Sequence, residues 1–400
     1  MNFPRILKKR KGYIDRIKPF MQKSVIKVLT GQRRVGKSFL LYQLIEEILA
    51  EEPDANIIYV NLEDFTFSSQ QTAEDLHPYI ISHSKEKVKN YIFIDEIQDI
   101  PGFEKVIRSL LLNEDNDIYI TGSNAKMLSG ELATYLSGRY IEFKIYSLSY
   151  SEFLEFHGLT ESETSYELYS RYGGLPYLLN LPLEDETVNE YLKSVYSTIV
   201  FRDVVSRYKL RNTLFLEKLI QFLSENIGNL FSAKNISDYL KSQHTTISVN
   251  QIQSYTEYLN NAFLIHRVER YDLIGKRVFE IGEKYYFENM GIRNIVIGYR
   301  ITDKAKILEN LVYNHLLYKG YDIKVGYYGD KEIDFIGEKN GEKLYIQVAL
   351  KIDGDTAERE FGNLLKIQDN YPKIVVTEDT FSGNSYEGIR HCPIRQFLME

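Results

Sequence analysis

One eight-residue segment near the beginning of the chain has the residue types and the spacing of a phosphate-binding loop. Residues 31–38 read Gly-Gln-Arg-Arg-Val-Gly-Lys-Ser, which satisfies the pattern G-x-x-x-x-G-K-[ST]. In such a loop the glycines let the backbone approach the phosphates, Lys37 reaches the β- and γ-phosphates, and Ser38 ligates Mg²⁺. An ordinary glycine turn is the alternative. The residues expected to contact ATP are Gly31, Arg34, Val35, Gly36, Lys37, Ser38 and Phe39.

A second segment carries the acidic groups that hydrolysis of a nucleotide requires. The apolar run Tyr91-Ile92-Phe93-Ile94 ends in Asp95-Glu96. Asp95 is expected to hold the Mg²⁺ ion, and Glu96 to act as the general base that polarises the attacking water. A carboxylate pair at the end of a strand can also simply face solvent without a chemical role, so this assignment depends on the phosphate-binding loop.

The elements around these motifs alternate between short apolar runs and helical patterns from residue 24 to residue 143. This alternation predicts an α/β fold with a parallel sheet and helices on both faces. The loop follows the first strand and opens a helix at Phe39–Ala50, so its amide groups face an anion. The expected strands are Ser24–Thr30, Asn56–Asn61, Tyr91–Asp95, Asp117–Thr121 and Tyr140–Lys144.

The adjacent Asp-Glu pair makes this region similar to the AAA+ division of P-loop ATPases. The resemblance implies that residues 118–124 form the sensor strand, with Asn124 or Ser123 orienting the hydrolytic water. It also implies that Arg139 is an arginine finger, which stabilises transition-state charge, usually on the nucleotide of a neighbouring subunit in a homo-oligomer. A surface salt bridge is the alternative for Arg139. The segment Gly174-Leu175-Pro176 resembles the element at which the lid of such proteins approaches the nucleotide.

The whole chain resembles a group of prokaryotic AAA+ ATPases with a winged-helix segment and a C-terminal nuclease-like domain of unknown function. Beyond the two motifs above, the resemblance rests on Ser137–Arg139, Gly173–Pro176, Arg202-Asp203, Lys284–Phe287, Glu309-Asn310, Glu332–Phe335 and Gln347-Val348. It implies four domains: an AAA+ domain with a basic N-terminal arm (1–148), a helical lid (149–212), a winged helix-turn-helix (213–300) and an α/β restriction-endonuclease-like domain (301–400).

The winged helix suggests contact with DNA. Helix Val249–Asn261 would be the recognition helix, with Ser248, Asn250, Gln251 and Gln253 near base edges. Basic residues of the following hairpin could neutralise phosphates: Arg267, Arg270, Lys276 and Arg277. Winged helices also serve as protein-interaction or lid modules, so this alternative stays open.

The last domain has the element order of PD-(D/E)xK nucleases, in which acidic groups bind Mg²⁺. Glu309 and Asp334 match the first two positions, but Gln347 and Ala349 stand where the second acid and the lysine belong. Lys351 could substitute for the lysine. With two of four chemical groups altered, we expect a degenerate domain with a binding or structural role, and cleavage is the alternative.

Charge and composition limit the partners and the compartment. The 400 residues carry 49 Lys and Arg against 56 Asp and Glu, a net charge of −7, but residues 1–40 are strongly basic and residues 41–190 strongly acidic. We expect the N-terminal arm to be neutralised within the protein or between subunits, and DNA contact through residues 1–40 is the alternative. One cysteine and no apolar run of about 18 residues predict a cytoplasmic protein without a membrane span.

Together these features predict Mg²⁺-dependent ATP binding and hydrolysis, coupled to conformational change and to possible DNA binding. The alternatives are a slow ATP-gated switch that binds DNA or protein, and an ATP-regulated nuclease.

Overall fold

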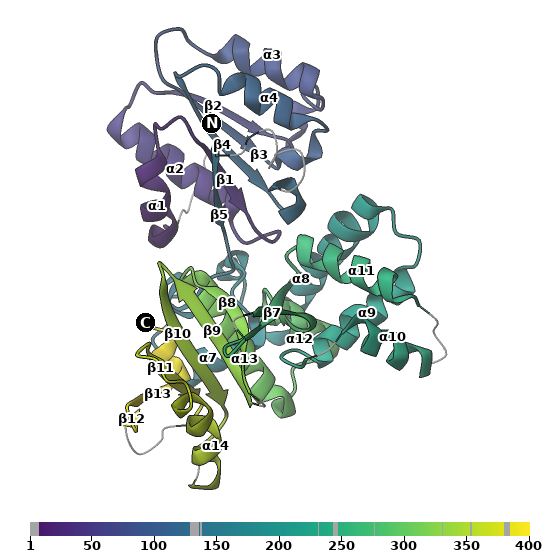
Figure 1. Ribbon diagram of the computed structural model, residues 1–400. Coiled ribbons are helices and arrows are strands. Elements are labelled where there is room, and N and C mark those ends of the chain that lie inside the picture. Colours follow the sequence, from purple (N-terminus) through teal and green to yellow (C-terminus); the bar gives the residue numbers. More distant parts are fainter. Residues whose placement is uncertain are drawn as a thin grey trace. The chain divides into compact units, whose positions relative to one another are not determined.

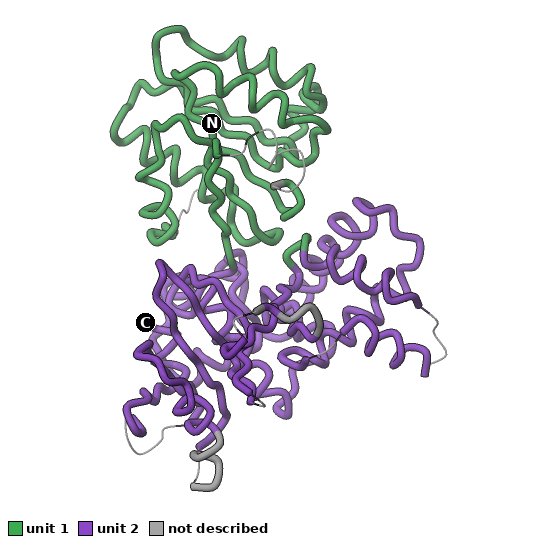
Figure 2. The backbone as a smooth tube through the Cα atoms, in the orientation of Figure 1, with its two compact units in different colours: residues 1–146, 261–263 green, residues 147–260, 264–400 purple. Residues whose placement is uncertain are grey.

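The computed structural model describes residues 8–128, 136, 138–230, 232–242, 247–275, 277–329, 331–352, 354–379 and 385–400. The chain divides into two compact units, which Figure 2 colours separately. Unit 1 comprises residues 1–146 with 261–263, and unit 2 comprises residues 147–260 with 264–400. The break after Tyr146 lies two residues before the expected end of the AAA+ domain at residue 148.

Unit 1 is built on a five-stranded sheet in which every described pairing is parallel (Figure 1). The strand order is β2-β3-β4-β1-β5. The strands are β1 (Ile26–Thr30), β2 (Asn56–Asn61), β3 (Asn90–Asp95), β4 (Asn116–Gly122) and β5 (Tyr140–Lys144). Because β4 lies between β1 and β3, the carboxyl ends of these three strands meet at one edge of the sheet. Ligands of open α/β sheets bind at this edge.

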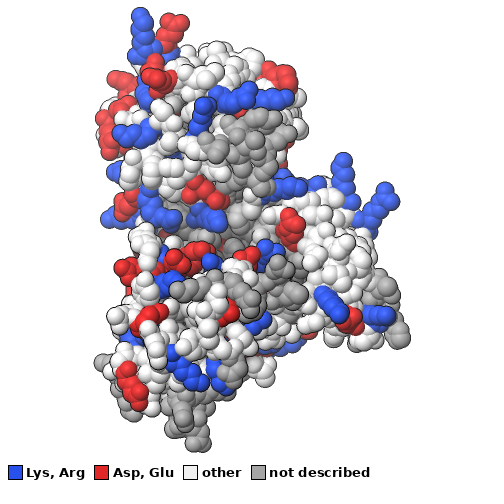
Figure 3. Space-filling model, in the orientation of Figure 1, with Lys and Arg blue, Asp and Glu red and all other residues white. Residues whose placement is uncertain are grey.

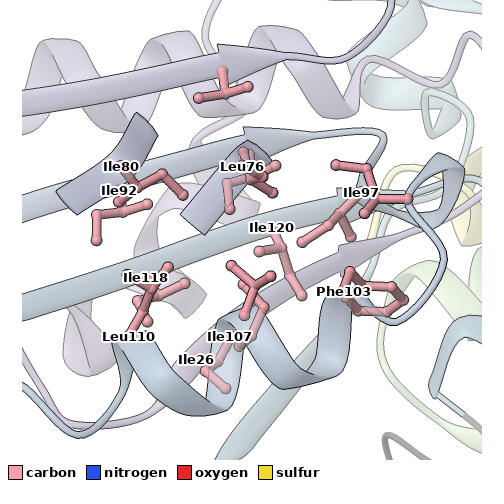
Figure 4. Packing of buried hydrophobic residues seen from close by; sticks show 14 of the residues in the cluster. Ile26, Leu76, Ile80, Ile92, Ile97, Phe103, Ile107, Leu110, Ile118 and Ile120 are labelled. Atoms are coloured by element: carbon pink, nitrogen blue, oxygen red, sulfur yellow. The ribbon is translucent and has the colours of Figure 1, made fainter. Parts of the chain in front are cut away.

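Helices cover both faces of this sheet, as the alternating pattern predicts (Figure 1). They are α1 (Lys11–Ile17), α2 (Lys37–Glu51), α3 (Ala73–His83) and α4 (Phe103–Leu110). Figure 4 shows a hydrophobic core of this unit, in which Ile92, Ile118 and Ile120 of the strands pack against side chains of α3 and α4. Burying each such side chain stabilises the unit by about 1.5–3 kcal/mol. This core holds the strands, and with them the site, in register.

Unit 2 begins with a run of helices before its first strand: α6 (Tyr150–His157), α7 (Glu163–Tyr172), α8 (Asp185–Thr198), α9 (Thr213–Glu225), α10 (Ala233–Ser242) and α11 (Val249–Asn261). Further helices lie between or after the strands: α12 (Met290–Ile297), α13 (Lys304–Tyr318), α14 (Gly354–Leu365) and α15 (Ile394–Phe397). The helix α8 continues into a π-helical turn, η6 (Ile199–Ser206), which contains the Arg202-Asp203 motif. The helical character expected from residue 149 onwards is therefore present.

A second, mixed sheet of eight strands completes unit 2, in the order β12-β13-β11-β10-β9-β8-β6-β7. Its strands are β6 (Ile265–Asp272), β7 (Arg277–Phe287), β8 (Asp322–Tyr328), β9 (Lys331–Lys339), β10 (Glu342–Ala349), β11 (Lys373–Thr377), β12 (Ser385–Tyr386) and β13 (Ile389–Pro393). The last two strands and α15 extend the element order that the sequence predicts for this region.

The hairpin β6–β7 joins segments that the sequence assigns to different domains. The sequence predicts it as the wing of a segment that ends at residue 300. In the structure β6 also pairs in parallel with β8, between Arg270 and Val325 and between Asp272 and Tyr327. The hairpin thus belongs to the same sheet as the strands of the expected nuclease-like domain. Local periodicity identifies a hairpin but does not reveal which distant strand it joins.

Among the described residues, no helix has the length and apolar character needed to cross a membrane.

Candidate nucleotide-binding site

The phosphate-binding loop connects β1 to α2 and depends on two glycines. Gly36 is the residue before the first turn of α2 and has a φ of 95°, in the left-handed region that glycine tolerates best. Gly31 has a φ of 153°, and a Cβ atom there would lie 2.1 Å from the carbonyl oxygen of Ile145. The loop therefore packs too closely against the end of β5 for any other residue at position 31. The amide groups at the start of α2 are left to face an anion.

Lys37 is the first residue of α2, and its side chain folds back over the loop. Its Nζ donates hydrogen bonds of 3.0 Å to the carbonyl oxygens of Gly31 and Gln32. The same Nζ lies 3.7 Å from the carboxylate of Glu96. Only 4% of the residue is exposed, so its charge acts within the site and is weakly screened.

Asp95 ends β3 and is surrounded by hydroxyl groups. The Thr121 hydroxyl donates to its Oδ1, the Tyr59 hydroxyl donates to its Oδ2 over 3.3 Å, and Ser38 also forms a hydrogen bond with it. Burial, and after it the charge of Glu96, raise the pKa of Asp95, while the bonds from Ser38 and Thr121 oppose this shift. A hydroxyl and a carboxyl in contact are the oxygen donors that Mg²⁺ prefers, so Ser38 and Asp95 fit this ion.

Glu96 follows directly and has a φ of 58°, which is uncommon for a residue other than glycine. Its Oε2 accepts hydrogen bonds from Gln98 Nε2 (2.6 Å) and from the Ser123 hydroxyl (3.0 Å). Burial by itself would raise the pKa of Glu96, but the charges of Lys37 and Arg33 outweigh burial and hold it below its usual value. The carboxylate is therefore ionised at neutral pH, as a general base must be.

The structure also locates the remaining residues that the sequence assigns to the nucleotide. In the loop and at the start of α2, Val35 is buried, whereas Arg34 and Phe39 are exposed. Asn124 is buried, with its Oδ1 accepting from the Lys126 amide, and its Nδ2 is an unsatisfied donor. Of the two sensor candidates, Ser123 is the one whose hydroxyl donates to the Glu96 carboxylate.

Arg139 is the one assigned residue that the structure places away from the site of its own subunit. It immediately precedes β5 and its carbonyl accepts from the Ile26 amide, so it lies at the amino end of the sheet. The five residues of β5 separate it from the opposite edge, about 16 Å at the usual rise of a strand. Ser137, in the same motif, lies outside the described residues.

The sequence interpretation missed three polar residues of this site. Thr121 contacts both acids, since its hydroxyl donates to Asp95 and accepts the Glu96 amide over 2.9 Å. The other two are Tyr59, beside Asp95, and Gln98, beside Glu96. A threonine at the end of a buried apolar strand was the available signal for Thr121. Nothing local distinguishes Tyr59 from the other tyrosines.

The basic N-terminal arm packs on this unit. Lys9 and Lys18 each lie 2.8 Å from the carboxylate of Glu47 on α2. Arg10 is buried, and its guanidinium donates to the carbonyl oxygens of Val35 in the loop (3.1 Å) and of Tyr146 (2.8 Å). These charges are therefore neutralised or satisfied within the unit.

In unit 2 the segment that resembles a lid element is closely packed. The Leu148 amide donates to the Gly174 carbonyl over 2.7 Å, and a Cβ atom on Gly174 would lie 2.3 Å from the Leu148 carbonyl oxygen. The glycine is thus required for the approach of two backbone segments within unit 2.

A parallel sheet, a glycine loop that opens a helix, and an acidic pair at the same edge define a P-loop nucleotide-binding domain. A family model described as an AAA domain matches residues 23–154, which places the domain in the AAA class. A second family model, described as a domain of unknown function, matches residues 163–303.

Two relatives match most of the chain. An uncharacterized protein of Haemophilus influenzae is 38% identical over 403 residues, with 98% of each chain covered. An uncharacterized protein of Methanocaldococcus jannaschii is 31% identical over 352 residues, covering 84% of this chain and 77% of that protein. The chain belongs to the family that these two proteins represent. Among solved structures, a Walker-type ATPase of Pyrococcus abyssi is similar with a TM-score of 0.49 and 15% identity, covering 73% of this chain and 96% of that one.

Proposed function

We propose that the protein binds ATP with Mg²⁺ and hydrolyses it at the loop 31–38. The observation that carries this proposal is the contact of Ser38, Asp95 and Thr121 at one edge of the sheet, with the ionised Glu96 beside them. A glycine turn without this function would not require a buried acidic pair at hydrogen-bonding distance from the helix that it opens.

Each residue has a separate role in the proposed reaction. The loop amides and Lys37 bind the phosphates, and Ser38 and Asp95 hold the metal, which when bound neutralises charge on the phosphate oxygens. Glu96 accepts a proton from the attacking water or orients it, because its carboxylate is ionised. Gln98 and Ser123 fix the direction of that carboxylate.

The position of Arg139 supports action on a neighbouring subunit. Arg139 is exposed at the amino end of β5, away from its own loop, which agrees with a finger supplied in trans by a homo-oligomer. Mixing inactive Arg139→Ala protein with inactive Lys37→Ala protein tests this role. A mixed assembly holds some sites with both residues, so activity should return on mixing. No recovery by a mixture shown to form mixed oligomers would contradict the proposal.

For DNA, the structure favours helix α11 over the hairpin. Ser248, at its start, and Asn250 and Gln253 are exposed, whereas the opposite face of the helix is buried. In the hairpin, Arg267 pairs with Glu269 and the Arg270 guanidinium lies 4.5 Å from the centre of the Tyr327 ring. Lys276 and the side chain of Arg277 lie outside the described residues. On the visible face of both units, basic and acidic side chains are interspersed (Figure 3).

Steady-state release of phosphate, measured with and without duplex or single-stranded DNA across a salt series, tests the proposal. We expect Mg²⁺-dependent turnover that is lost in Lys37→Ala and retained in Lys126→Ala, a matched lysine change outside the loop. If DNA stimulates turnover through phosphate contacts, the stimulation must fall steeply with salt. Equal turnover in wild type and Lys37→Ala would refute the assignment. Tight ATP binding with negligible turnover would instead favour the slow ATP-gated switch.

A further inference from the structure

Four sequence motifs that the nucleotide site does not use meet at one place in unit 2. They are Lys284–Phe287 on β7, Glu309-Asn310 on α13, Glu332–Phe335 on β9 and Gln347-Val348 on β10. Their convergence forms a cluster of three acids around one lysine, which we call the Lys284 cluster: Lys284, Glu309, Glu332 and Asp334.

Lys284 lies at the centre of this cluster. Its Nζ is 2.8 Å from Glu332 Oε1, 2.9 Å from Glu309 Oε1 and 3.8 Å from Asp334 Oδ1. An ammonium group has three N–H donors and no acceptor; Glu309 and Glu332 lie at hydrogen-bonding distance from it, and Asp334 lies at the longer distance of an ion pair. The Lys284 side chain is only 3% exposed, so it cannot reach a substrate in solution.

Neighbouring groups fix the acids in place around the ammonium. The Tyr286 hydroxyl donates to Glu309 Oε1 over 2.6 Å, and the Val348 amide donates to Asp334 Oδ2 over 2.8 Å. Asn310 forms two 2.8 Å hydrogen bonds with the backbone of Phe287, one as acceptor and one as donor. This pair joins α13 to β7 and so sets the distance between Glu309 and Lys284.

The cluster sets the charge of one lysine against three acids. Burial, and after it the charge of Glu309, raise the pKa of Asp334 to about 8, while the charge of Lys284 opposes this shift. Glu309 and the partly exposed Glu332 lie closest to the ammonium. Gln347 follows Ile346, which pairs with Phe335 in the antiparallel register, and precedes Val348, whose amide donates to Asp334. An acid at position 347 would add a further negative charge that the lysine could not balance.

We propose that the Lys284 ammonium is the permanent cation of this cluster and takes the place that a divalent metal would occupy in a nuclease core. The residues therefore do not fit a metal-dependent nuclease. Instead, the cluster is a fixed ionic anchor that ties β7 to α13 and β9. This role explains why Glu309 and Asp334 are present together although Gln347 and Ala349 replace the remaining catalytic groups.

Binding of Mn²⁺ alone to the nucleotide-free full chain tests the proposal, with Lys37→Ala in every protein to disable the loop. Electron paramagnetic resonance would report bound Mn²⁺, and thermal melting would report stabilisation. We expect no Mn²⁺ at the intact cluster. In Lys284→Met, millimolar Mn²⁺ should replace the lost cation. It should raise the melting temperature by about 5 °C when the Mn²⁺ concentration is about a hundred times the dissociation constant of Mn²⁺ at the cluster. The matched control Lys284→Met with Glu309→Gln should lose most of this gain.

Three outcomes would overturn the proposal. The first is a folded Lys284→Met protein that Mn²⁺ does not stabilise. The second is Mn²⁺ binding to the intact cluster that disappears in Asp334→Asn, and this result is informative even if Lys284→Met does not fold. The third is plasmid cleavage with Mg²⁺ or Mn²⁺ that Asp334→Ala abolishes. The binding and melting results do not depend on ATP hydrolysis, because Lys37→Ala removes that activity.

Discussion

Replacing Thr121 by valine should damage both the stability and the chemistry of unit 1, because one hydroxyl serves both acids. In the wild type this hydroxyl donates to Asp95 and accepts the Glu96 amide over 2.9 Å. Valine has nearly the same shape but cannot form either bond. The substitution therefore leaves the Glu96 amide without a partner in a fully buried position and removes one donor from Asp95.

The size of the effect follows from these two losses. An unsatisfied buried amide costs about 1–3 kcal/mol, and the lost bond to Asp95 adds about 1 kcal/mol, so we expect about 2–4 kcal/mol of lost stability. For a unit of this size the melting temperature should fall by about 5–15 °C. Turnover should fall about 10- to 100-fold at a temperature where the variant is folded, since both acids lose their alignment.

Two control variants separate chemistry from stability. Thr121→Ser keeps the hydroxyl and should cost about 1 kcal/mol while retaining most of the turnover. Thr377→Val removes another buried strand hydroxyl, which bonds to Asp379 and His391 in unit 2, and should lower stability without lowering turnover. Differential scanning calorimetry and phosphate release measure both quantities. A Thr121→Val protein with wild-type turnover would refute the role given to this hydroxyl.

Three further predictions concern other parts of the chain. Lys27→Met should destabilise unit 1 by about 3–5 kcal/mol in urea unfolding, because it leaves the fully buried Asp117 without its cation. The double variant Lys27→Met with Asp117→Leu should recover much of the lost stability. Equal stabilities of the single and the double variant would contradict this role of the ion pair. Burial lowers the pKa of His315 to about 3, so the folded state excludes a proton that the unfolded state binds below about pH 6.5. Between pH 6 and 5 the stability of the wild type should therefore fall relative to that of His315→Asn by about 1.4 kcal/mol per pH unit. Asp334 contributes equally to both proteins, so its opposite slope cancels in this difference. Parallel stability profiles of the two proteins would refute the prediction. Gly31→Ala should abolish ATP binding in a nucleotide-binding assay, because its Cβ would meet the Ile145 carbonyl at 2.1 Å, whereas Gly138→Ala, at another positive φ but with no atom within 4 Å, should bind normally.

Much of the nucleotide site could be predicted because its signals are local. The glycine loop, the helix that it opens and the acid pair each occupy a few consecutive residues. The structure then brings Ser38 and Asp95 into contact because β1 and β3 flank β4 in a parallel sheet. Thr121 and Tyr59 escaped notice because their roles depend on neighbouring strands rather than on neighbours in the sequence.

In the C-terminal half, local sequence patterns do not predict which distant elements come into contact. The hairpin β6–β7 has the local pattern of a wing, but its partner β8 begins about fifty residues later and no short pattern encodes that pairing. The role of Lys284 could not be predicted for the same reason. It lies in a tyrosine-rich strand without a local sign of an ionic role, and the acids that surround it come from other elements: Glu309, Glu332 and Asp334.

Single-turnover hydrolysis by Glu96→Gln tests the central claim, Mg²⁺-dependent ATP hydrolysis at this site, most directly. Glutamine preserves the shape of the side chain and an acceptor for Gln98 and Ser123, but it cannot take a proton from water. We predict that Glu96→Gln binds ATP with Mg²⁺ about as tightly as wild type and releases phosphate at least about 100-fold more slowly. Phosphate release at the wild-type rate by a Glu96→Gln protein with normal ATP binding would contradict the account.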